Sequence, residues 1–167
     1  MTPSTSASEA RREHDAVLAA GEHLFQQLPL RVAEPGDADF AMEMDLDRRF
    51  TNPRGGLQGG LVATLADIVA GRALLEVVPT DHHLTTADLT IHYLRGVTIG
   101  PARAEARIVR CGRTLAVVTV EIIDAGAAVR EAAAICTLSF AVLPPRPTNT
   151  DPALPDPDLP DPEPTEE

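Results

Sequence analysis

The stretch Gly59–Val77, GGLVATLADIVAGRALLEV, decides the fold that this sequence predicts. It has helical character and is almost wholly apolar, and Pro79 ends it. A helix that is apolar on nearly every side has to be buried. We therefore expect this helix to form the centre of the domain, covered by the segments that flank it.

Alternating apolar and polar residues predict one strand before this helix and four after it. The expected strands are at about Asp39–Leu46, Thr85–Leu94, Ala102–Val109, Thr114–Ile123 and Arg130–Val142. Because short turns join the later strands, they should form an antiparallel sheet. The sequence thus predicts an α+β fold in which one antiparallel sheet wraps around a long central helix.

Two details of these strands are specific enough to be checked. In the strand after the helix, the alternation places two sets of residues on opposite faces: Ala87, Leu89, Ile91 and Tyr93 on one, and Thr86, Asp88, Thr90 and His92 on the other. The two cysteines, Cys111 and Cys136, lie in or directly beside predicted strands. We expect them to be buried free thiols.

Composition divides the chain into three parts. Residues 1–37 read as an N-terminal tail and a helix at about Glu9–Gln27, residues 38–143 as the domain, and residues 144–167 as a tail. That tail holds nine of the 15 prolines, and seven acidic residues against one arginine. Such a segment cannot form a core, so we expect it to be disordered and to aid solubility; a docking role is the alternative.

The charge balance excludes several classes of function. With a net charge of −11, only 3% aromatic residues and no basic stripe, the chain is not expected to bind nucleic acid. No apolar run is long enough for a membrane span, and the polar N-terminus lacks a signal-peptide core, so we expect a cytoplasmic protein. All 14 basic residues are arginine, which excludes Schiff-base and P-loop lysines. We expect no cofactor and no metal ion.

Three features near the helix could carry chemistry. Gly59-Gly60 lies at its start, where unpaired N–H groups can stabilise developing negative charge on a carbonyl oxygen; a loop that needs positive φ is the alternative explanation. Asp67 is a carboxylate among apolar residues, which is costly unless it is paired or functional; an exposed residue or one capped by Thr64 is the alternative. Asn52 precedes a proline, where a turn role is common.

The stretch from Asn52 to Asp67, NPRGGLQGGLVATLAD, resembles the hotdog-fold acyl-CoA thioesterases of the PaaI type. Their pattern is Asn, then His-Gly-Gly six residues later, then an acid nine residues after the His, and both spacings are kept. The segment TADLTIHYLR from Thr86, the turn RCGRT from Arg110 and the ending AICTLSF from Ala134 also fit. The resemblance covers about residues 38–143.

This resemblance implies a role for each matching residue. Asn52 would hold the thioester or its attacking water, the Gly59 N–H would polarise the carbonyl, Asp67 would activate water or attack directly, and Thr86 would orient the water. Gln58 stands where the family has histidine; it keeps a donor and an acceptor but cannot carry a proton near neutral pH. Gln58 and Gly60 are therefore assigned to substrate binding.

Two other functions compete with acyl-CoA hydrolysis. Gln58 is the support for a non-catalytic hotdog protein that only binds acyl-CoA. A hotdog hydratase or dehydratase would need an Asp and a His acting together. His82, His83 and His92 do not follow Asp67 at a suitable spacing.

Helix geometry predicts the assembly. Gly59 and Asp67 are eight residues apart, about 12 Å along a helix axis, so one thioester cannot reach both. We expect a homodimer, or a dimer of dimers, in which antiparallel helices bring Gly59 of one chain near Asp67 of the other. The phosphates of coenzyme A would meet arginines, with Arg110 and Arg113 at a hairpin, or Arg95, as candidates.

Overall fold

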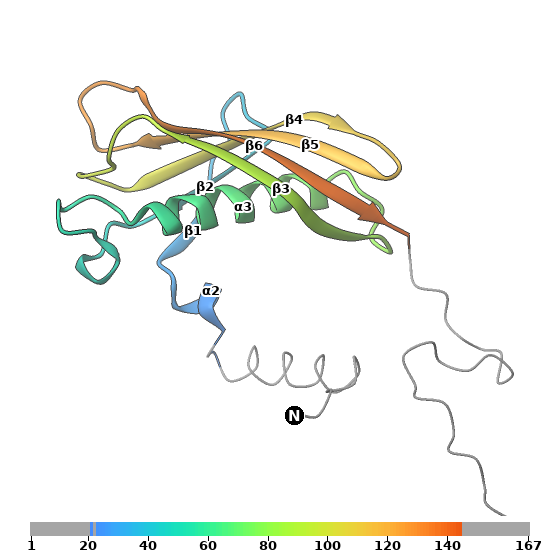
Figure 1. Ribbon diagram of the computed structural model, residues 1–167, viewed down its shortest axis with the longest axis horizontal. Helices are drawn as coiled ribbons and strands as arrows, with labels where there is room; N and C mark the ends of the chain where they lie inside the picture. Colours follow the sequence, from blue (N-terminus) through green and yellow to red (C-terminus); the bar gives the residue numbers. More distant parts are fainter. Residues whose placement is uncertain (1–20, 22, 145–167) are drawn as a thin grey trace, which may run out of the picture. The chain divides into compact units, whose positions relative to one another are not determined.

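The computed structural model describes residue 21 and residues 23–144 (Figure 1). In chain order the elements are α2 (Leu24–Gln27), β1 (Leu30–Ala33), β2 (Phe40–Met44), the 3-10 helix η1 (Arg48–Phe50), α3 (Gly59–Leu75), β3 (His83–Tyr93), β4 (Ala102–Cys111), β5 (Leu115–Asp124) and β6 (Ala132–Leu143). The first part of the predicted N-terminal helix and the segment 145–167 lie outside the described residues. No helix in the described part is long and apolar enough to span a membrane.

The strands form one antiparallel sheet in the order β1-β2-β4-β5-β6-β3, and α3 lies against one face of it (Figure 1). The four strands predicted after the helix, and the one before it, are all present. The predicted architecture, an antiparallel sheet around one long helix, is therefore confirmed. The strand β3 directly follows the helix in sequence but lies at the edge of the sheet, because it pairs only with β6.

One strand was not predicted. The short strand β1 pairs with β2, with Leu30 opposite Met44 and Ala33 opposite Ala41. The guanidinium of Arg31 in β1 forms ion pairs with Glu43, at 2.6 Å, and with Asp45. Four residues are too few for alternation to be recognised in a sequence, and pairing with an existing strand is what makes this segment extended.

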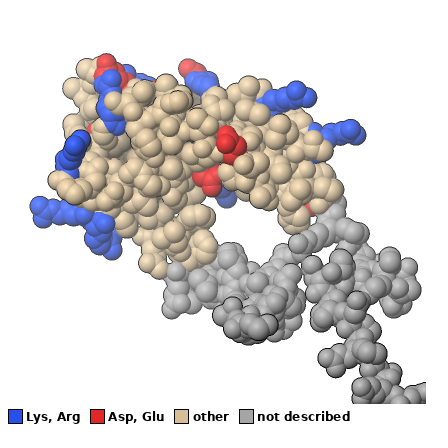
Figure 2. Space-filling model, in the orientation of Figure 1, with Lys and Arg blue, Asp and Glu red and all other residues tan. Residues whose placement is uncertain are grey.

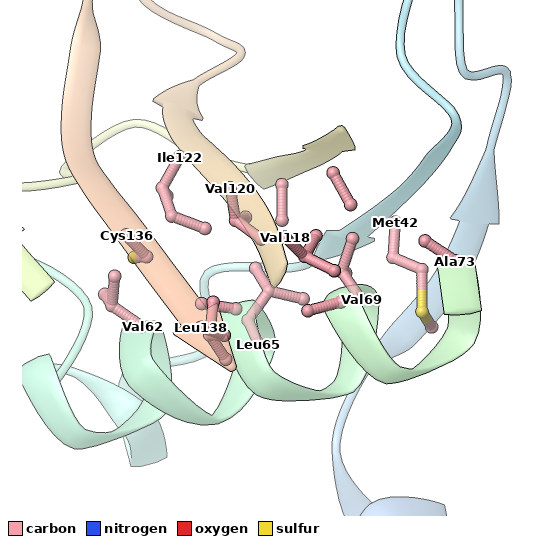
Figure 3. Packing of buried hydrophobic residues seen from close by; sticks show 14 of the residues in the cluster. Met42, Val62, Leu65, Val69, Ala73, Val118, Val120, Ile122, Cys136 and Leu138 are labelled. Carbon is pink, nitrogen blue, oxygen red and sulfur yellow. The ribbon is translucent and has the colours of Figure 1, made fainter. Parts of the chain in front are cut away.

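The core lies between α3 and the sheet. Residues at helical spacing on α3 are buried: Val62, Leu65, Ala66, Val69, Ala70, Ala73 and Leu74. Figure 3 shows Leu65 and Val69 of this helix close to Val118 of β5 and Leu138 of β6. Opposite the helix on β4 stand three small residues, Ala102, Ala104 and Ala106, each fully buried. Small side chains there let the helix approach the sheet closely, so the row of alanines sets how deeply α3 sits.

A β-bulge interrupts β3. Thr86 lies opposite Phe140 of β6, but the next paired residue, Asp88, lies opposite Ser139, so Ala87 is an extra residue. A bulge shifts the alternation of side chains by one position. Thr86 therefore shares the helix-facing side with Phe140, and the predicted placement of Thr86 with Asp88, Thr90 and His92 is wrong for this residue.

A buried carboxylate fixes the connection between β3 and β4. Asp124, 8% exposed, accepts hydrogen bonds from the backbone N–H groups of Thr98 (2.8 Å), Ile99 (3.0 Å) and Gly100 (2.7 Å). Burial alone would raise the pKa of Asp124, but these backbone donors outweigh burial and hold the pKa below its ordinary value. The carboxylate thus ties the end of β5 to a loop that has no regular structure.

The two cysteines differ. Cys136 is a buried free thiol, as predicted, and burial raises its pKa to about 11. Cys111 is free but exposed, so the prediction that it is buried is wrong. It stands at the very end of β4, where the strand runs past the part of the sheet that α3 covers.

We predict that Asp124→Asn lowers the free energy of unfolding by about 2 kcal/mol at neutral pH, because it removes a charge that several N–H groups solvate. The pKa of Asp124 is lower in the folded state than its ordinary 3.8, so its stabilisation is present above that value and is lost as pH falls through the folded-state pKa. The difference between wild type and variant should therefore shrink in acid. Urea unfolding at several pH values measures it.

The matched control is Asp37→Asn, which makes the same change at an exposed position. This control should keep wild-type stability at neutral pH. An Asp124→Asn variant as stable as the control at neutral pH would contradict the anchoring role.

Candidate active site

Asp67 lies on α3 and is half-buried. The hydroxyl of Thr86 on β3 donates a hydrogen bond of 2.8 Å to its Oδ1 atom. Thr64 does not cap Asp67, because its hydroxyl donates to the Gly60 carbonyl at 2.9 Å. The structure thus brings together two of the predicted site residues, and it is the bulge at Ala87 that turns Thr86 towards the helix.

A pocket of about 410 Å³ adjoins this pair. Its lining is mainly apolar, with Ile68 and Leu75 from α3 and Leu84 from β3, and it also includes the guanidinium-bearing Arg72. An apolar wall beside a carboxylate suits a substrate with an apolar part next to a polar reacting group.

The loop between β2 and α3 is held by Asn52. Its Oδ1 atom accepts from the N–H groups of Arg54 (2.9 Å) and Gly56 (3.3 Å), and its backbone N–H donates to the Gly56 carbonyl at 2.7 Å. Its Nδ2 atom lies 3.5 Å from the Leu57 carbonyl, a long contact for a hydrogen bond. The side-chain oxygen of Asn52 therefore has the predicted turn role, whereas its amide N–H groups make one long contact.

Four glycines flank the start of the helix, and they are there for different reasons. Gly55 has φ +82°, a conformation that favours glycine. A Cβ atom at Gly56 would lie 3.3 Å from the Val97 carbonyl, so close approach of backbone explains this glycine. Gly59 and Gly60 do not have positive φ, which excludes that explanation for the pair that begins α3.

The start of α3 is open to a ligand. Gln58 occupies the N-cap position, but its side chain makes no capping hydrogen bond, so the first N–H groups of the helix are not satisfied by it. Instead its backbone N–H donates to the Phe50 carbonyl at 2.9 Å, and its Nε2 atom lies 3.5 Å from the Thr51 carbonyl. Gln58 thus braces the loop rather than the helix.

A second pocket, of about 440 Å³, lies at this end of the helix and is lined by Asn52, Gly59 and Tyr93. Arg54 and Arg95 also line this pocket. Arg95 was predicted as an alternative candidate for phosphate binding, whereas Arg54 was not predicted. Arg95 forms an ion pair with Glu131. The lining of this pocket does not include Asp67, and that of the Asp67 pocket does not include Gly59. Within one chain the predicted residues therefore lie in two separate places, which we call half-sites: Asn52 and Gly59 at one, and Asp67 and Thr86 at the other.

Arg110 and Arg113 lie elsewhere. Both are exposed at the β4–β5 hairpin, and Arg113 lines a third pocket together with Val78 and His82. Neither arginine lines the pocket at Gly59. Tyr93, which does, was predicted only as a strand residue; its spacing from the helix gives no signal in the sequence.

Comparisons with known proteins show which family this chain is similar to. Residues 55–130 match the family model described as Thioesterase superfamily, a segment that contains Gln58, Gly59, Gly60, Asp67 and Thr86 and begins just after Asn52. A Saccharolobus solfataricus protein named "Putative esterase" is 28% identical over 111 residues, covering 66% of this chain and 79% of that protein.

Two solved structures give the fold. A mutant thioesterase from Pseudomonas aeruginosa has a TM-score of 0.62 and 25% identity, covering 86% of this chain and 96% of its own. A Bacillus halodurans protein solved with CoA has a TM-score of 0.65 and 26% identity, covering 87% of this chain and 100% of its own. The sheet around one long helix is thus the hotdog fold, as predicted. Residues 55–130, which include most of the candidate site, are thus similar to the thioesterase superfamily.

Proposed function

We propose that this protein is a PaaI-type acyl-CoA thioesterase, which hydrolyses an acyl-CoA thioester to the free acid and CoA. The observation that carries the proposal is the hydrogen bond from Thr86 to Asp67, which holds a carboxylate on the surface of a largely apolar helix. The superfamily match supports thioester hydrolysis, and the similar Bacillus halodurans structure with CoA supports a CoA ester as substrate.

The arrangement of Asp67 suits the activation of water. Because Thr86 donates to Oδ1, the other carboxylate oxygen can accept a proton from water while the water oxygen attacks the thioester carbonyl carbon. The carbon–sulfur bond then breaks, and the proton passes to the sulfur of CoA. Direct attack by the carboxylate, followed by hydrolysis of the resulting anhydride, gives the same products.

The other half-site suits the carbonyl oxygen. The N–H of Gly59, at a helix start without a side-chain cap, would stabilise the negative charge that develops on that oxygen. The amide N–H groups of Asn52 would hold the thioester or the water, since its side-chain oxygen is already used by the loop. Gln58 and Gly60 border the same end of the helix and would contact the substrate there.

A second copy of the chain would bring the two half-sites together. The side of α3 that faces away from the sheet carries apolar residues, including the half-buried Ile68 and the exposed Leu75. Beside it the edge strand β3 offers unpaired backbone groups to another strand. On the side of the molecule seen in Figure 2, arginines gather at the margins, and the middle is uncharged apart from a few acidic side chains. We infer a homodimer, or a dimer of dimers, with α3 helices antiparallel.

Arginines would bind the phosphates of CoA. Arg54 and Arg95 already border the pocket at Gly59 and are the nearest candidates. Arg110 and Arg113 would serve only where a second copy brings the β4–β5 hairpin to that pocket.

Asp67→Asn should lower kcat for acyl-CoA hydrolysis by about a thousandfold, because it removes the base or nucleophile and leaves the fold intact. The measurement is release of free thiol from a panel of short to long acyl-CoAs, including arylacetyl and hydroxybenzoyl types. Glu76→Gln, at an exposed carboxylate that ends the same helix, is the matched control and should retain wild-type kcat. Wild-type protein that binds acyl-CoA saturably but releases no thiol would instead be an acyl-CoA-binding protein.

The bulge predicts different results for two adjacent threonines. Thr86→Val should lower kcat about tenfold, because it removes one hydrogen bond to the reacting carboxylate. Thr85→Val makes the same change on the other face of β3 and should leave kcat unchanged. Equal losses in both variants would show that strand stability, not the contact with Asp67, is what matters.

Mixed dimers test the shared site. Asp67→Asn and Asn52→Asp chains should each form inactive homodimers, whereas a heterodimer of the two would have one intact site and about half of the wild-type activity. Asn52→Asp keeps the side-chain acceptor that holds the loop. Co-expression with two affinity tags isolates the heterodimer. An inactive heterodimer would show that each site is built from one chain.

A further inference from the structure

Tyr93 connects the end of β3 to the start of α3. Its hydroxyl donates a hydrogen bond of 2.7 Å to the carbonyl oxygen of Gly59. Its ring lies against the same residue, because a Cβ atom at Gly59 would be 3.5 Å from the ring atoms Cε1 and Cζ. Tyr93 also lines the pocket at this end of the helix. It therefore contacts the half-site without belonging to the motif that defines it.

The bond from Tyr93 acts on a peptide group at the exposed start of the helix. The Gly59 carbonyl and the Gly60 N–H belong to one peptide unit, so a donor on the carbonyl oxygen polarises that unit and strengthens its N–H as a donor. Gly60 is exposed, and a Cβ atom there would have nothing within 4 Å. Glycine is less favourable than alanine within a helix, and no described neighbour would clash with a side chain at Gly60. Open space at Gly60 suits the approach of a ligand.

We propose that Tyr93 is a positioning residue, which fixes the Gly59–Gly60 peptide so that the Gly60 N–H stabilises the thioester oxygen together with the Gly59 N–H. This inference rests on the proposed thioesterase function and adds a second donor and the group that orients it. Burial, with a further contribution from Cys136, raises the pKa of Tyr93 above its ordinary 10.0, so the hydroxyl keeps its proton at neutral pH.

Kinetics provide the first test. Tyr93→Phe keeps the ring against Gly59 and removes only the hydroxyl, so kcat should fall about tenfold while KM stays within about twofold. Thr90→Val is the matched control, since it removes a β3 hydroxyl that contacts Asp88 and not the helix. An unchanged kcat in Tyr93→Phe, or a loss of kcat matched by a similar rise in KM, would overturn the proposal.

Infrared spectroscopy of the bound thioester gives a readout that a purely structural role would not move. Acyl-CoA labelled with ¹³C at the thioester carbonyl, with the acyl chain turned over fastest in the panel, is bound to the Asp67→Asn protein. Hydrogen bonds to the oxygen lower the carbonyl stretching frequency. Adding Tyr93→Phe should move the band back towards that of free acyl-CoA. A band that does not move would overturn the inference.

The two proposals fail in distinguishable ways. If wild-type protein binds acyl-CoA without turnover, the proposal of thioester hydrolysis is wrong. The role of Tyr93 is then tested by the carbonyl band of the tightest-binding acyl-CoA, compared between wild type and Tyr93→Phe. The chain has one tyrosine and no tryptophan, so a change in intrinsic fluorescence of the wild type reports binding beside Tyr93 itself. Absence of acyl-CoA binding throughout the panel would overturn both proposals.

Discussion

The burial of α3 under a single curved sheet is the constraint on which the rest of this structure depends. Only one side of the helix meets the sheet, and there the alanines of β4 and the larger side chains of β5 and β6 fill the space between them. Because the helix is apolar on its other side as well, the fold leaves part of its most hydrophobic element in contact with solvent. Asp67 lies on that exposed side, beside the edge strand.

A series of hydrogen bonds holds the start of α3 in position. Asp124 at the end of β5 holds the loop at Thr98–Gly100, and the neighbouring Val97 carbonyl accepts a bond of 2.9 Å from the N–H of Leu57. Leu57 directly precedes the N-cap residue Gln58. A buried charge at the end of the central strand β5 thereby fixes the loop that carries half of the candidate site, while Tyr93 at the end of β3 contacts the helix start.

The sequence predicted the elements that depend on local pattern and missed those that depend on pairing. The helix and five strands follow from periodicity, and the resemblance carried by Asn52, Gly59 and Asp67 pointed to residues that line two pockets. β1 is too short to show a period, and it is extended because it pairs with β2. The bulge at Ala87 follows from the register with β6, so alternation placed Thr86 on the wrong face. Tyr93 reaches Gly59 across 34 positions, which only the fold reveals.

The bulge in β3 has a consequence for how such a strand can change over time. Ala87 is the extra residue, so a chain that lost it would pair Thr86 with Phe140 and Asp88 with Ser139 in unbroken alternation, and the same side chains of His83–Thr86 would face the helix. Thr86 would keep its place beside the carboxylate of Asp67. The contact between Thr86 and Asp67 therefore tolerates the loss of this residue, a length change that would reverse the alternation at most positions of a strand.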